Sequence, residues 1–352
     1  MFLGIYSNHH SRGIAARAVF VLKSDRMETI TKNSAQRELE RLGIKKADIA
    51  ESFALYGKKV SITKDGRLID HSCGIVFEAK KPVLATKSWK NEDTIIDVGD
   101  LKIGGNMVAV IAGPCSIESE AQLLEVAISV KRSGATILRG GAFKPRTSPY
   151  QFQGHGEKAL RLLKKIGSDL GMPVVSEIVS TKDVELFAEV GVDIIQIGMR
   201  NAQNFELLKA VAKSSMPILL KRGAGNTVDE WIGAAEYILA NGNGNVMLCE
   251  RGIRTHENST RYTLDLGGMA CASLLATHLP VGADPSHSAG RRELVAAHAL
   301  ASVAAGADFV MVEVHNEPEK ALSDSGQQLN LGQFADMMVN LKRVAQAIDR
   351  DM

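Results

Sequence analysis

Apolar runs of strand length alternate with amphipathic stretches of helix length from residue 107 to the end of the chain. The eight apolar runs are Met107–Ala112, Ala135–Leu138, Pro173–Ser176, Asp193–Ile197, Pro217–Leu220, Asn245–Leu248, Leu279–Ala283 and Asp308–Val312. The helical patterns are Glu118–Arg132, Gly156–Leu170, Thr181–Val190, Asn204–Ser214, Thr227–Ala240, Arg261–His278, Arg291–Ala305 and Leu331–Ile348. Continuous runs of Val, Ile and Leu are typical of strands buried on both faces, as in a parallel sheet. The pattern therefore predicts repeated β/α units.

The polar residues that follow the apolar runs favour a closed barrel over an open, doubly wound sheet. In chain order they are Pro114-Cys115, Arg139 with Lys144, Glu177, Arg200-Asn201, Lys221-Arg222, Glu250-Arg251, Asp284-Pro285-Ser286-His287 and Glu313-Val314-His315. In a barrel the carboxyl ends of all strands meet at one rim, where active sites of this fold lie. The length from residue 93 to 352 also matches the usual size of about 250 residues. We therefore predict an α/β fold with a (β/α)8 TIM barrel.

Residues 1–90 form a less regular region, which we interpret as a small N-terminal α/β appendage before a catalytic barrel at residues 91–352. Its predicted elements are a strand at Ala18–Leu22, a helix at Ser34–Leu42, and a hairpin of Val60–Thr63 and Arg67–Ile69 around Asp65-Gly66. A second hairpin, Thr94–Val98 with Leu101–Ile103, is predicted to close the bottom of the barrel.

Composition narrows the class of protein. The 352 residues include 42 basic and 40 acidic side chains, a net charge of +2, so neither a nucleic-acid partner nor a membrane partner is expected. The four cysteines, Cys73, Cys115, Cys249 and Cys271, form no Cys-x-x-Cys pair, which argues against a disulfide framework or a zinc ribbon. We expect a soluble, cytoplasmic protein, since the N-terminus also lacks the features of a signal peptide.

Two groups of residues at the predicted rim carry candidate chemistry. Arg139, Lys144, Arg146, Arg200, Lys221 and Arg251 are cations suited to phosphate and carboxylate groups, although a basic loop is often only solvated surface. Pro145 and Pro149 stiffen the loop Arg139–Gly154 that carries three of them. Cys115, His287, Glu313 and Asp324 offer a donor set that suits Mn, Fe, Co or Zn, although each residue alone is often structural. His315 is a weaker candidate.

Several motifs resemble those of 3-deoxy-D-arabino-heptulosonate 7-phosphate (DAHP) synthases of the type I beta subfamily. They are Ala112–Glu118, Leu138–Gly154, Ile197–Asn204, Leu219–Gly223, Cys249–Thr255, Asp284–His287, and Glu313–His315 through Ala321–Asp324. The resemblance covers nearly all of residues 93–349. It implies a metal-dependent transferase that condenses phosphoenolpyruvate with erythrose 4-phosphate at the entry to the shikimate pathway of aromatic amino acid biosynthesis. Members are usually homo-oligomers.

The resemblance also assigns roles to residues of this chain. The implied metal ligands are Cys115, His287, Glu313 and Asp324, and the implied phosphoenolpyruvate pocket is Arg139, Lys144, Glu177, Arg200, Lys221 and Arg251. Lys144, Pro145, Arg146 and Thr147 would hold erythrose 4-phosphate. Lys144, Cys115 and His287 are the candidate catalytic residues, with Lys144 as a proton donor to the new alkoxide. The metal would polarise the aldehyde.

Three other functions compete with this interpretation. A 3-deoxy-octulosonate 8-phosphate synthase would use arabinose 5-phosphate, but its loop reads closer to Lys-Ala-Asn-Arg-Ser than to Lys144–Ser148 here. A Schiff-base aldolase would use Lys144 or Lys221 as its nucleophile. A regulatory barrel would bind ligand without turnover. In some relatives the N-terminal region is a ferredoxin-like inhibitory domain and in others a helical chorismate mutase, and residues 1–90 match neither well. Feedback inhibition by aromatic amino acids is thus a hypothesis that rests only on the position of the appendage.

Overall fold

The computed structural model describes residues 39–78, 81–146 and 148–352, and it separates into two compact units that divide between Lys81 and Pro82. The sequence placed this boundary near residue 90. Residues 82–90 instead belong with the barrel, because the Glu236 carboxylate accepts the backbone N–H groups of Val83, Leu84 and Ala85 at 3.0, 2.9 and 2.8 Å. Within the described residues, no helix has the length and apolar character needed to cross a membrane.

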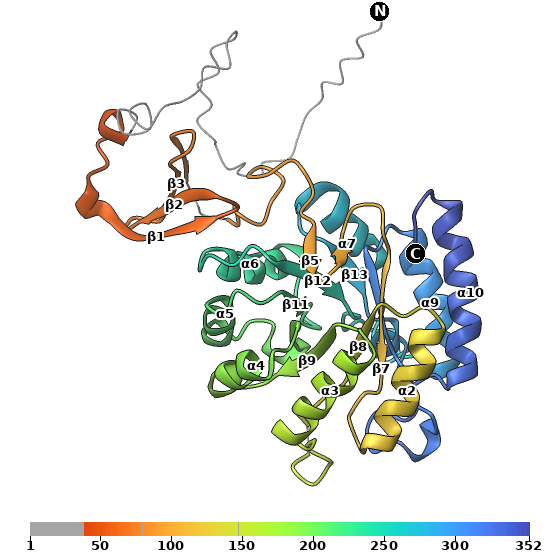
Figure 1. Ribbon diagram of the computed structural model, residues 1–352. Helices are drawn as coiled ribbons and strands as arrows, with labels where there is room; N and C mark the ends of the chain where they lie inside the picture. Colours follow the sequence, from red (N-terminus) through yellow and green to blue (C-terminus); the bar gives the residue numbers. More distant parts are fainter. Residues whose placement is uncertain (1–38, 79–80, 147) are drawn as a thin grey trace, which may run out of the picture. The chain divides into compact units, whose positions relative to one another are not determined.

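The first unit contains a four-stranded antiparallel sheet in the order β1-β2-β3-β4 (Figure 1). Its elements are η1 (Lys46–Asp48), β1 (Ile49–Leu55), β2 (Lys58–Thr63), β3 (Arg67–Asp70) and β4 (Ile75–Glu78). The predicted hairpin around Asp65-Gly66 is confirmed, with β2 and β3 antiparallel and Gly66 at φ 82° in the turn. The predicted strand Ala18–Leu22 and the first part of the predicted helix Ser34–Leu42 lie outside the described residues.

The second unit is a closed barrel of eight parallel strands, as predicted, which excludes the open sheet. The strands are β7 (Ala109–Gly113), β8 (Ile137–Arg139), β9 (Val174–Ile178), β10 (Ile194–Ile197), β11 (Ile218–Lys221), β12 (Val246–Glu250), β13 (Val281–Ala283) and β14 (Phe309–Glu313). Each strand pairs with the next, and β14 pairs with β7 from Phe309 opposite Ala109 to Glu313 opposite Gly113. The strand ends therefore converge on one rim.

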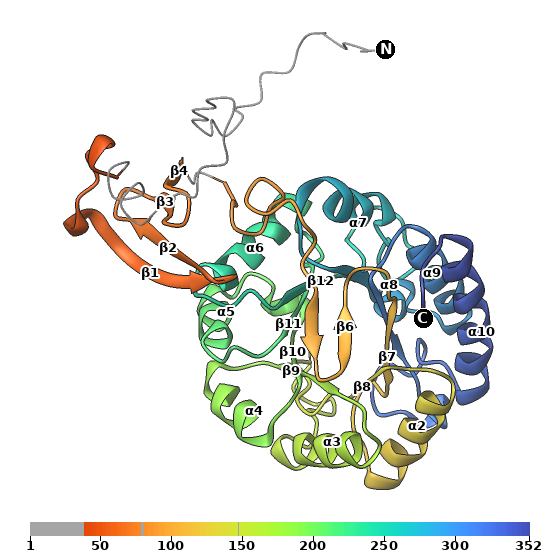
Figure 2. The ribbon, with the colours of Figure 1, turned by 45° about the horizontal axis from the view of Figure 1, so that its top comes forward.

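Helices surround the strands (Figure 2). They are α2 (Glu120–Arg132), α3 (Glu157–Asp169), α4 (Val184–Val190), α5 (Phe205–Ala212), α6 (Val228–Leu239), α7 (Leu266–Cys271), the π-helix η4 (Ala272–Ala276), α8 (Pro285–Ala289), α9 (Arg292–Ala304) and α10 (Leu331–Ala347). Short 3₁₀ turns lie at η2 (Thr181–Asp183), η3 (Met199–Asn201) and η5 (Pro318–Lys320). The predicted capping box at Thr227 and Glu230 is present at the start of α6.

Two local predictions need correction. A helix was predicted at Arg261–His278, but α7 begins only at Leu266, where the Asp265 side chain accepts from Gly268 N and caps the helix. The residues before it form a loop, because Asp265 satisfies the first free N–H groups of the helix at that point. The five-residue helix α8 was not predicted. It begins after Asp284, whose side chain accepts the backbone N–H of His287, with Pro285 in its first turn.

An apolar hairpin fills the amino-terminal end of the barrel, as the sequence predicted. Strands β5 (Ile96–Val98) and β6 (Leu101–Ile103) pair antiparallel, and Figure 2 shows them across the middle of the ring. Ile96, Val98 and Ile103 are fully or almost fully buried in one cluster with inward-facing strand residues such as Ile111 and Met311. This end of the barrel is thus a packed hydrophobic core, and the opposite end is left for the polar residues.

Candidate active site

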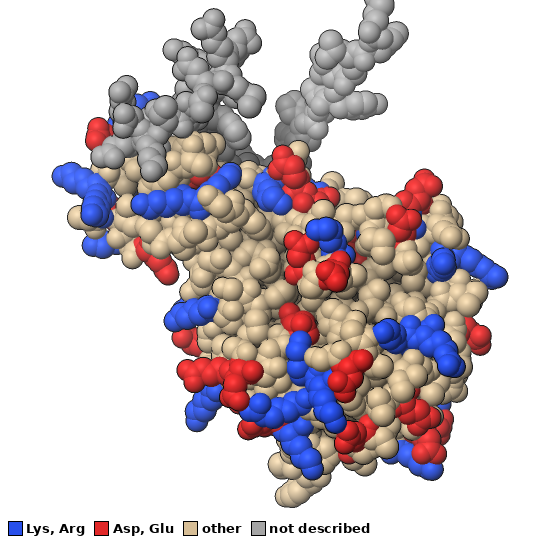
Figure 3. All heavy atoms as spheres, viewed as in Figure 1, with Lys and Arg blue, Asp and Glu red and all other residues tan. Residues whose placement is uncertain are grey.

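A polar cavity of about 280 Å³ lies at the carboxyl ends of the barrel strands. It is lined by Lys144, Pro145, Arg146, Gln151, Glu177, Gly198, Met199, Arg200, Lys221, Arg251, Arg261, His287 and Asp324. Nine of these residues were predicted from the sequence to bind substrate or metal. Elsewhere on the barrel, acidic and basic side chains are intermingled over the face shown in Figure 3. Thr147, the last predicted acceptor-binding residue, lies outside the described residues.

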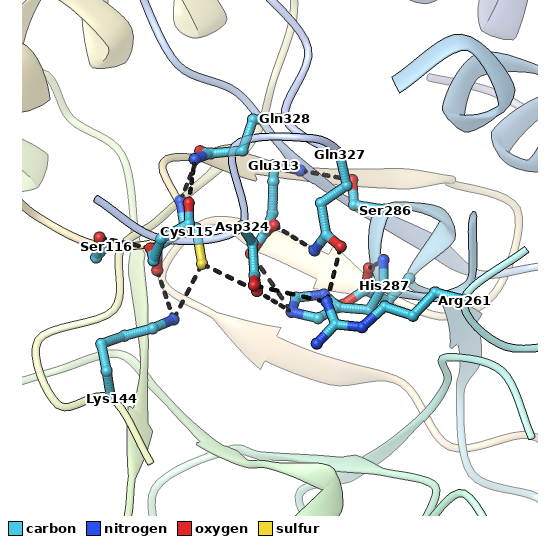
Figure 4. Close-up of polar contacts among 12 residues, drawn as sticks. Cys115, Ser116, Lys144, Arg261, Ser286, His287, Glu313, Asp324, Gln327 and Gln328 are labelled. Atoms are coloured by element: carbon cyan, nitrogen blue, oxygen red, sulfur yellow. Dashed lines mark hydrogen bonds and ion pairs between the residues drawn. The ribbon is translucent and has the colours of Figure 1, made fainter. Parts of the chain in front are cut away.

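The four predicted metal ligands converge beside this cavity (Figure 4). Cys115 Sγ lies 3.5 Å from Asp324 Oδ2, and the donor atoms of Cys115, Glu313 and Asp324 all lie within 4.8 Å of one another. His287 Nε2 lies 3.5 Å from Glu313 Oε1 and 3.8 Å from Asp324 Oδ2. One soft donor and two carboxylates lie close enough to share an ion, and the His287 imidazole lies next to both carboxylates. Such a set can hold a divalent transition metal.

Different elements bring the four donors together. Cys115 follows β7, His287 lies in α8, Glu313 is the last residue of β14, and Asp324 lies in the loop before α10. The backbone N–H of Cys115 donates to Gln328 Oε1 at 2.9 Å. Two hydrogen bonds of 2.7 Å fix the Glu313 carboxylate, one from Arg139 Nη1 and one from Gln327 Nε2. The candidate ligand set is therefore held in place by side chains around it.

The charges in the cluster oppose one another. Burial raises the pKa of the Cys115 thiol to about 12, and the neighbouring Glu313 carboxylate adds to the rise. Burial also acts to raise the pKa of Glu313, but the positive charges of His287 and Arg139 outweigh it and lower that pKa. A cation bound among these groups would favour the thiolate, so its binding would release a proton.

Asp284 connects the candidate metal ligands to the candidate anion-binding cations, a role that we did not predict. Its Oδ2 atom accepts from Lys221 Nζ at 2.5 Å and from His287 Nδ1 at 2.7 Å. The second contact leaves Nε2 of the His287 ring facing Glu313 and Asp324. Burial alone would raise the pKa of Asp284, but His287 and Lys221 hold it well below its usual value. The sequence signal was an aspartate just before Pro285, a typical helix N-cap.

Lys144 reaches the same cluster from the loop after β8. Its Nζ donates to the Cys115 carbonyl oxygen at 3.0 Å and to Cys115 Sγ at 3.1 Å. Burial acts to lower the pKa of Lys144, but the negative groups around it, Cys115, Glu313 and Glu177, raise the pKa overall. A lysine held in the ammonium form suits anion binding and proton donation, and it argues against Lys144 as the nucleophile of a Schiff-base aldolase.

The remaining predicted residues divide by side-chain direction. Lys221 and Arg251 line the cavity. Their neighbours in sequence, Arg222 and Glu250, pair with each other at 2.8 Å, and Arg222 also lies 2.8 Å from Asp265. Gln196 Nε2 donates to Glu177 Oε2 at 3.1 Å. Gly198 permits this position of Glu177, because a Cβ at residue 198 would lie 1.9 Å from Glu177 Oε1.

Arg251 is buried at the wall of the cavity, and its Nη1 atom has no hydrogen-bond partner among the described residues. Its guanidinium stacks on Tyr262, 4.3 Å from the ring centroid, and burial lowers its pKa. A buried cationic donor without a partner is costly. The arrangement is thus suited to an anionic ligand.

His315 lies away from the donor cluster, against Glu118. It is buried, and its Nε2 atom lies 3.5 Å from Glu118 Oε2. The same Glu118 carboxylate accepts the backbone N–H of Leu322 at 2.9 Å, two residues before Asp324. His315 is not among the residues that line the cavity.

Known proteins are similar to this chain in sequence and in fold. The sequence model of the DAHP synthetase I family matches residues 84–350. Phospho-2-dehydro-3-deoxyheptonate aldolase of Thermotoga maritima is 48% identical over 274 residues, which are 78% of this chain and 80% of the relative. 2-Dehydro-3-deoxyphosphooctonate aldolase of Syntrophotalea carbinolica is 36% identical over 256 residues, 68% of this chain and 91% of the relative.

Two solved structures from Thermotoga maritima also match. A phospho-2-dehydro-3-deoxyheptonate aldolase (DAHP synthase) has a TM-score of 0.76 at 41% identity and covers 91% of this chain and 96% of its own. A truncated form of 3-deoxy-D-arabino-heptulosonate 7-phosphate synthase has a TM-score of 0.71 at 44% identity and covers 76% of this chain and 98% of its own. The first of these matches covers a larger share of the chain than the barrel unit alone contains. It therefore extends into residues before Pro82.

Proposed function

Because the chain belongs to the DAHP synthetase I family, we propose that it condenses phosphoenolpyruvate with erythrose 4-phosphate to give DAHP and inorganic phosphate, the first step of the shikimate pathway. The observation that carries this proposal is that a metal-type donor set lies beside a cavity lined by several cations. Two phosphates and a carboxylate need several fixed cations, and an aldehyde is activated by a Lewis acid.

The donors of Cys115, His287, Glu313 and Asp324 fit one divalent cation such as Mn, Fe, Co or Zn. When bound there, the ion would polarise the aldehyde carbonyl. Asp284 would keep the His287 ring turned for this role, as carboxylate partners of ligating histidines do. Lys144 would stay close enough to the same point to act on the aldehyde oxygen.

The cavity cations would bind phosphoenolpyruvate. The proposed set is Arg139, Lys144, Arg200, Lys221 and Arg251, with Glu177 beside them. Arg251 supports this assignment because it supplies an unpaired buried donor. Lys221 and Arg139 are already fixed by carboxylates, so little order need be gained on binding.

The reaction forms a carbon–carbon bond and a bond from C2 to a water oxygen, and it breaks the bond between C2 and the phosphate oxygen. C3 of phosphoenolpyruvate bonds to the aldehyde carbon, and the aldehyde oxygen takes a proton, which we assign to the Lys144 ammonium group. Water adds its oxygen to C2 and gives up two protons, one to restore the Lys144 ammonium group and one to the departing phosphate. The bond between C2 and the phosphate oxygen breaks in this process, which leaves a ketone at C2 and releases inorganic phosphate. Lys144, Pro145, Arg146 and Thr147 would hold the acceptor during these steps.

The test is turnover by purified protein supplied with Mn²⁺, phosphoenolpyruvate and erythrose 4-phosphate. We expect equal amounts of inorganic phosphate and DAHP, measured by a phosphate assay and by NMR, and loss of both with a chelator. Phosphate release without a new carbon–carbon bond would refute the proposal. Trapping of a lysine adduct by borohydride would instead favour a Schiff-base aldolase.

Arabinose 5-phosphate is the second acceptor to test, because a relative named 2-dehydro-3-deoxyphosphooctonate aldolase also matches this chain, at 36% identity. We expect a higher kcat/KM with erythrose 4-phosphate, since the relative at 48% identity is a heptonate aldolase. A higher kcat/KM with arabinose 5-phosphate would assign the chain to the octulosonate reaction. We further propose a cytoplasmic homo-oligomer, and the four unpaired cysteines support a reducing compartment.

A further inference from the structure

The loop between β12 and α7, residues 251–265, brings two neighbouring side chains to the active site. Arg261 N donates to Ala289 O at 3.0 Å and Tyr262 N donates to Ser288 O at 2.9 Å, which ties the loop to the segment after His287. Gly252 permits the close approach, because a Cβ there would lie 2.5 Å from Tyr262 Cβ. The loop is thus built into the site.

Arg261 lies at the mouth of the cavity next to Asp324. Its Nη1 atom donates to Gln327 Oε1 at 2.9 Å and lies 3.6 Å from Asp324 Oδ1. Figure 4 shows Arg261 beside both residues. Arg146 approaches the same Oδ1 atom, with its Nη1 at 3.9 Å. Both arginines line the cavity. Two guanidinium groups therefore converge on one point at the rim.

Arg261 and Arg146, the rim arginines, differ from the deeper cations Arg139 and Lys221 in exposure and in pairing. The Arg139 and Lys221 side chains are 5% and 4% exposed, and each lies within 2.7 Å of a carboxylate oxygen. The Arg261 and Arg146 side chains are 38% and 16% exposed, and their contacts with Asp324 exceed hydrogen-bond length. Most of the five N–H donors of each rim arginine remain available for an anion.

We propose that Arg261, together with Arg146, binds the phosphate group of the aldose phosphate acceptor. This inference rests on the proposed condensation and adds a residue to its acceptor site. Asp324 is the outermost of the four donors, with a side chain 17% exposed against 0% for Glu313. An acceptor whose aldehyde lies at the donor cluster extends outward past Asp324, and its far end meets the two guanidinium groups. Gln327 joins the two regions, since it binds both Glu313 and Arg261.

The test compares Arg261→Gln and Arg261→Lys with Arg254→Gln as the control. Arg254 is an exposed cation of the same loop that does not line the cavity. With the metal-loaded enzyme, we expect R261Q to raise KM for erythrose 4-phosphate roughly 10- to 100-fold, as for loss of a charge-assisted contact, and to leave KM for phosphoenolpyruvate unchanged. R261K should raise KM for erythrose 4-phosphate less than R261Q does, and R254Q should have the KM of the wild type.

Erythrose without its phosphate separates binding from a structural effect. If Arg261 contacts the phosphate, wild type and R261Q should use erythrose equally poorly. An equal proportional loss with erythrose and erythrose 4-phosphate, or an unchanged KM in R261Q, would overturn the proposal.

Binding of erythritol 4-phosphate, which has no aldehyde, gives a readout that needs no turnover. Calorimetry should show that R261Q binds erythritol 4-phosphate more weakly, by the same factor as its KM for erythrose 4-phosphate rises. The metal content and melting temperature of R261Q should equal those of the wild type. Equal binding by both proteins would contradict the proposal. Absence of turnover by the wild type would refute the proposed function, and this binding measurement would still decide the anion site.

Discussion

The two ends of the barrel are built from the same strands and differ in what fills them. At the amino-terminal end, hairpin residues such as Ile96 and Ile103 pack into a fully apolar cluster. At the carboxyl end, buried charges are paired, as in Arg139 with Glu313 and Lys221 with Asp284. Buried ion pairs are weak evidence of stability, because desolvation opposes their attraction. The hairpin end therefore supplies stability, and the ion pairs of the charged end hold its side chains in place for chemistry.

The largest expected effect is loss of activity on removal of the Cys115 thiol. We expect Cys115→Ala to lower kcat/KM about 1000-fold or more, because a ligand of the proposed metal is lost while the protein stays folded. Steady-state kinetics and metal analysis check this. Cys249→Ala is the matched control, since Cys249 is equally buried but belongs to the apolar cluster, and it should keep full activity. Equal activity of both variants would contradict the proposed role of Cys115 as a metal ligand.

The opposite pattern is expected at the hairpin. Ile96→Ala should lower the free energy of unfolding by about 2–5 kcal/mol, because it leaves a cavity in a fully buried cluster, with kcat unchanged below the transition. Denaturant titration measures the loss. Ile95→Ala, at a side chain 50% exposed on the neighbouring position, should change stability by less than about 1 kcal/mol. Similar losses in both variants would show that the hairpin does not seal the core.

The substitution Asp284→Asn tests the link between the proposed metal ligands and the cations of the cavity. The amide keeps the shape but loses the charge shared by Lys221 and His287. We expect roughly 10- to 100-fold weaker metal binding, as for other carboxylate partners of ligating histidines. Calorimetric titration with Mn²⁺ measures it. Asp229→Asn, in the first turn of α6, serves as the control, and unaltered affinity in Asp284→Asn would remove Asp284 from the account.

The smallest expected effect is a pH dependence at the hairpin end. His278 Nε2 donates to Leu84 O at 2.7 Å and Nδ1 accepts from Thr94 Oγ1 at 2.9 Å, and burial, with Lys90 nearby, lowers its pKa below 6.5. The unfolded chain therefore binds more protons below pH 6.5, so stability falls as pH drops from 6.5 towards the folded pKa. The slope is at most about 1.4 kcal/mol per pH unit.

Denaturant titrations of His278→Gln against pH test this contribution. The variant should lose the part of the slope that His278 supplies between the folded pKa and pH 6.5. His256→Gln, at an exposed position, is the control and should keep the wild-type slope. An unchanged slope in His278→Gln would remove this contribution.

The sequence predicted the barrel well because burial on both faces leaves a plain signal, a run such as Val246–Leu248 without polar interruption. It placed Cys115, His287, Glu313 and Asp324 in one site through motif resemblance, and the structure brings their donors together. Spacing alone could not have done so, since contacts between distant segments depend on closure of the barrel.

Side-chain direction and loop contacts were harder to predict. Lys221 and Arg222 are adjacent, yet only Lys221 lines the cavity, because successive strand residues point to opposite faces. Arg261 was placed in a helix, and the aspartate cap at Asp265 that ends the loop was the signal for its true position. Tyr262 and Gln327 have no motif of their own, since their roles depend on partners distant in sequence.

A crystal structure of the Mn²⁺-loaded protein, with anomalous diffraction to locate the metal, tests the central claim most directly. We predict one strong peak about 2.0–2.6 Å from Cys115 Sγ, His287 Nε2 and oxygens of Glu313 and Asp324. In crystals soaked with phosphoenolpyruvate, density for the ligand should touch Arg251 beside that peak. An active protein whose metal lies elsewhere, or whose Cys115 does not contact it, would contradict the account.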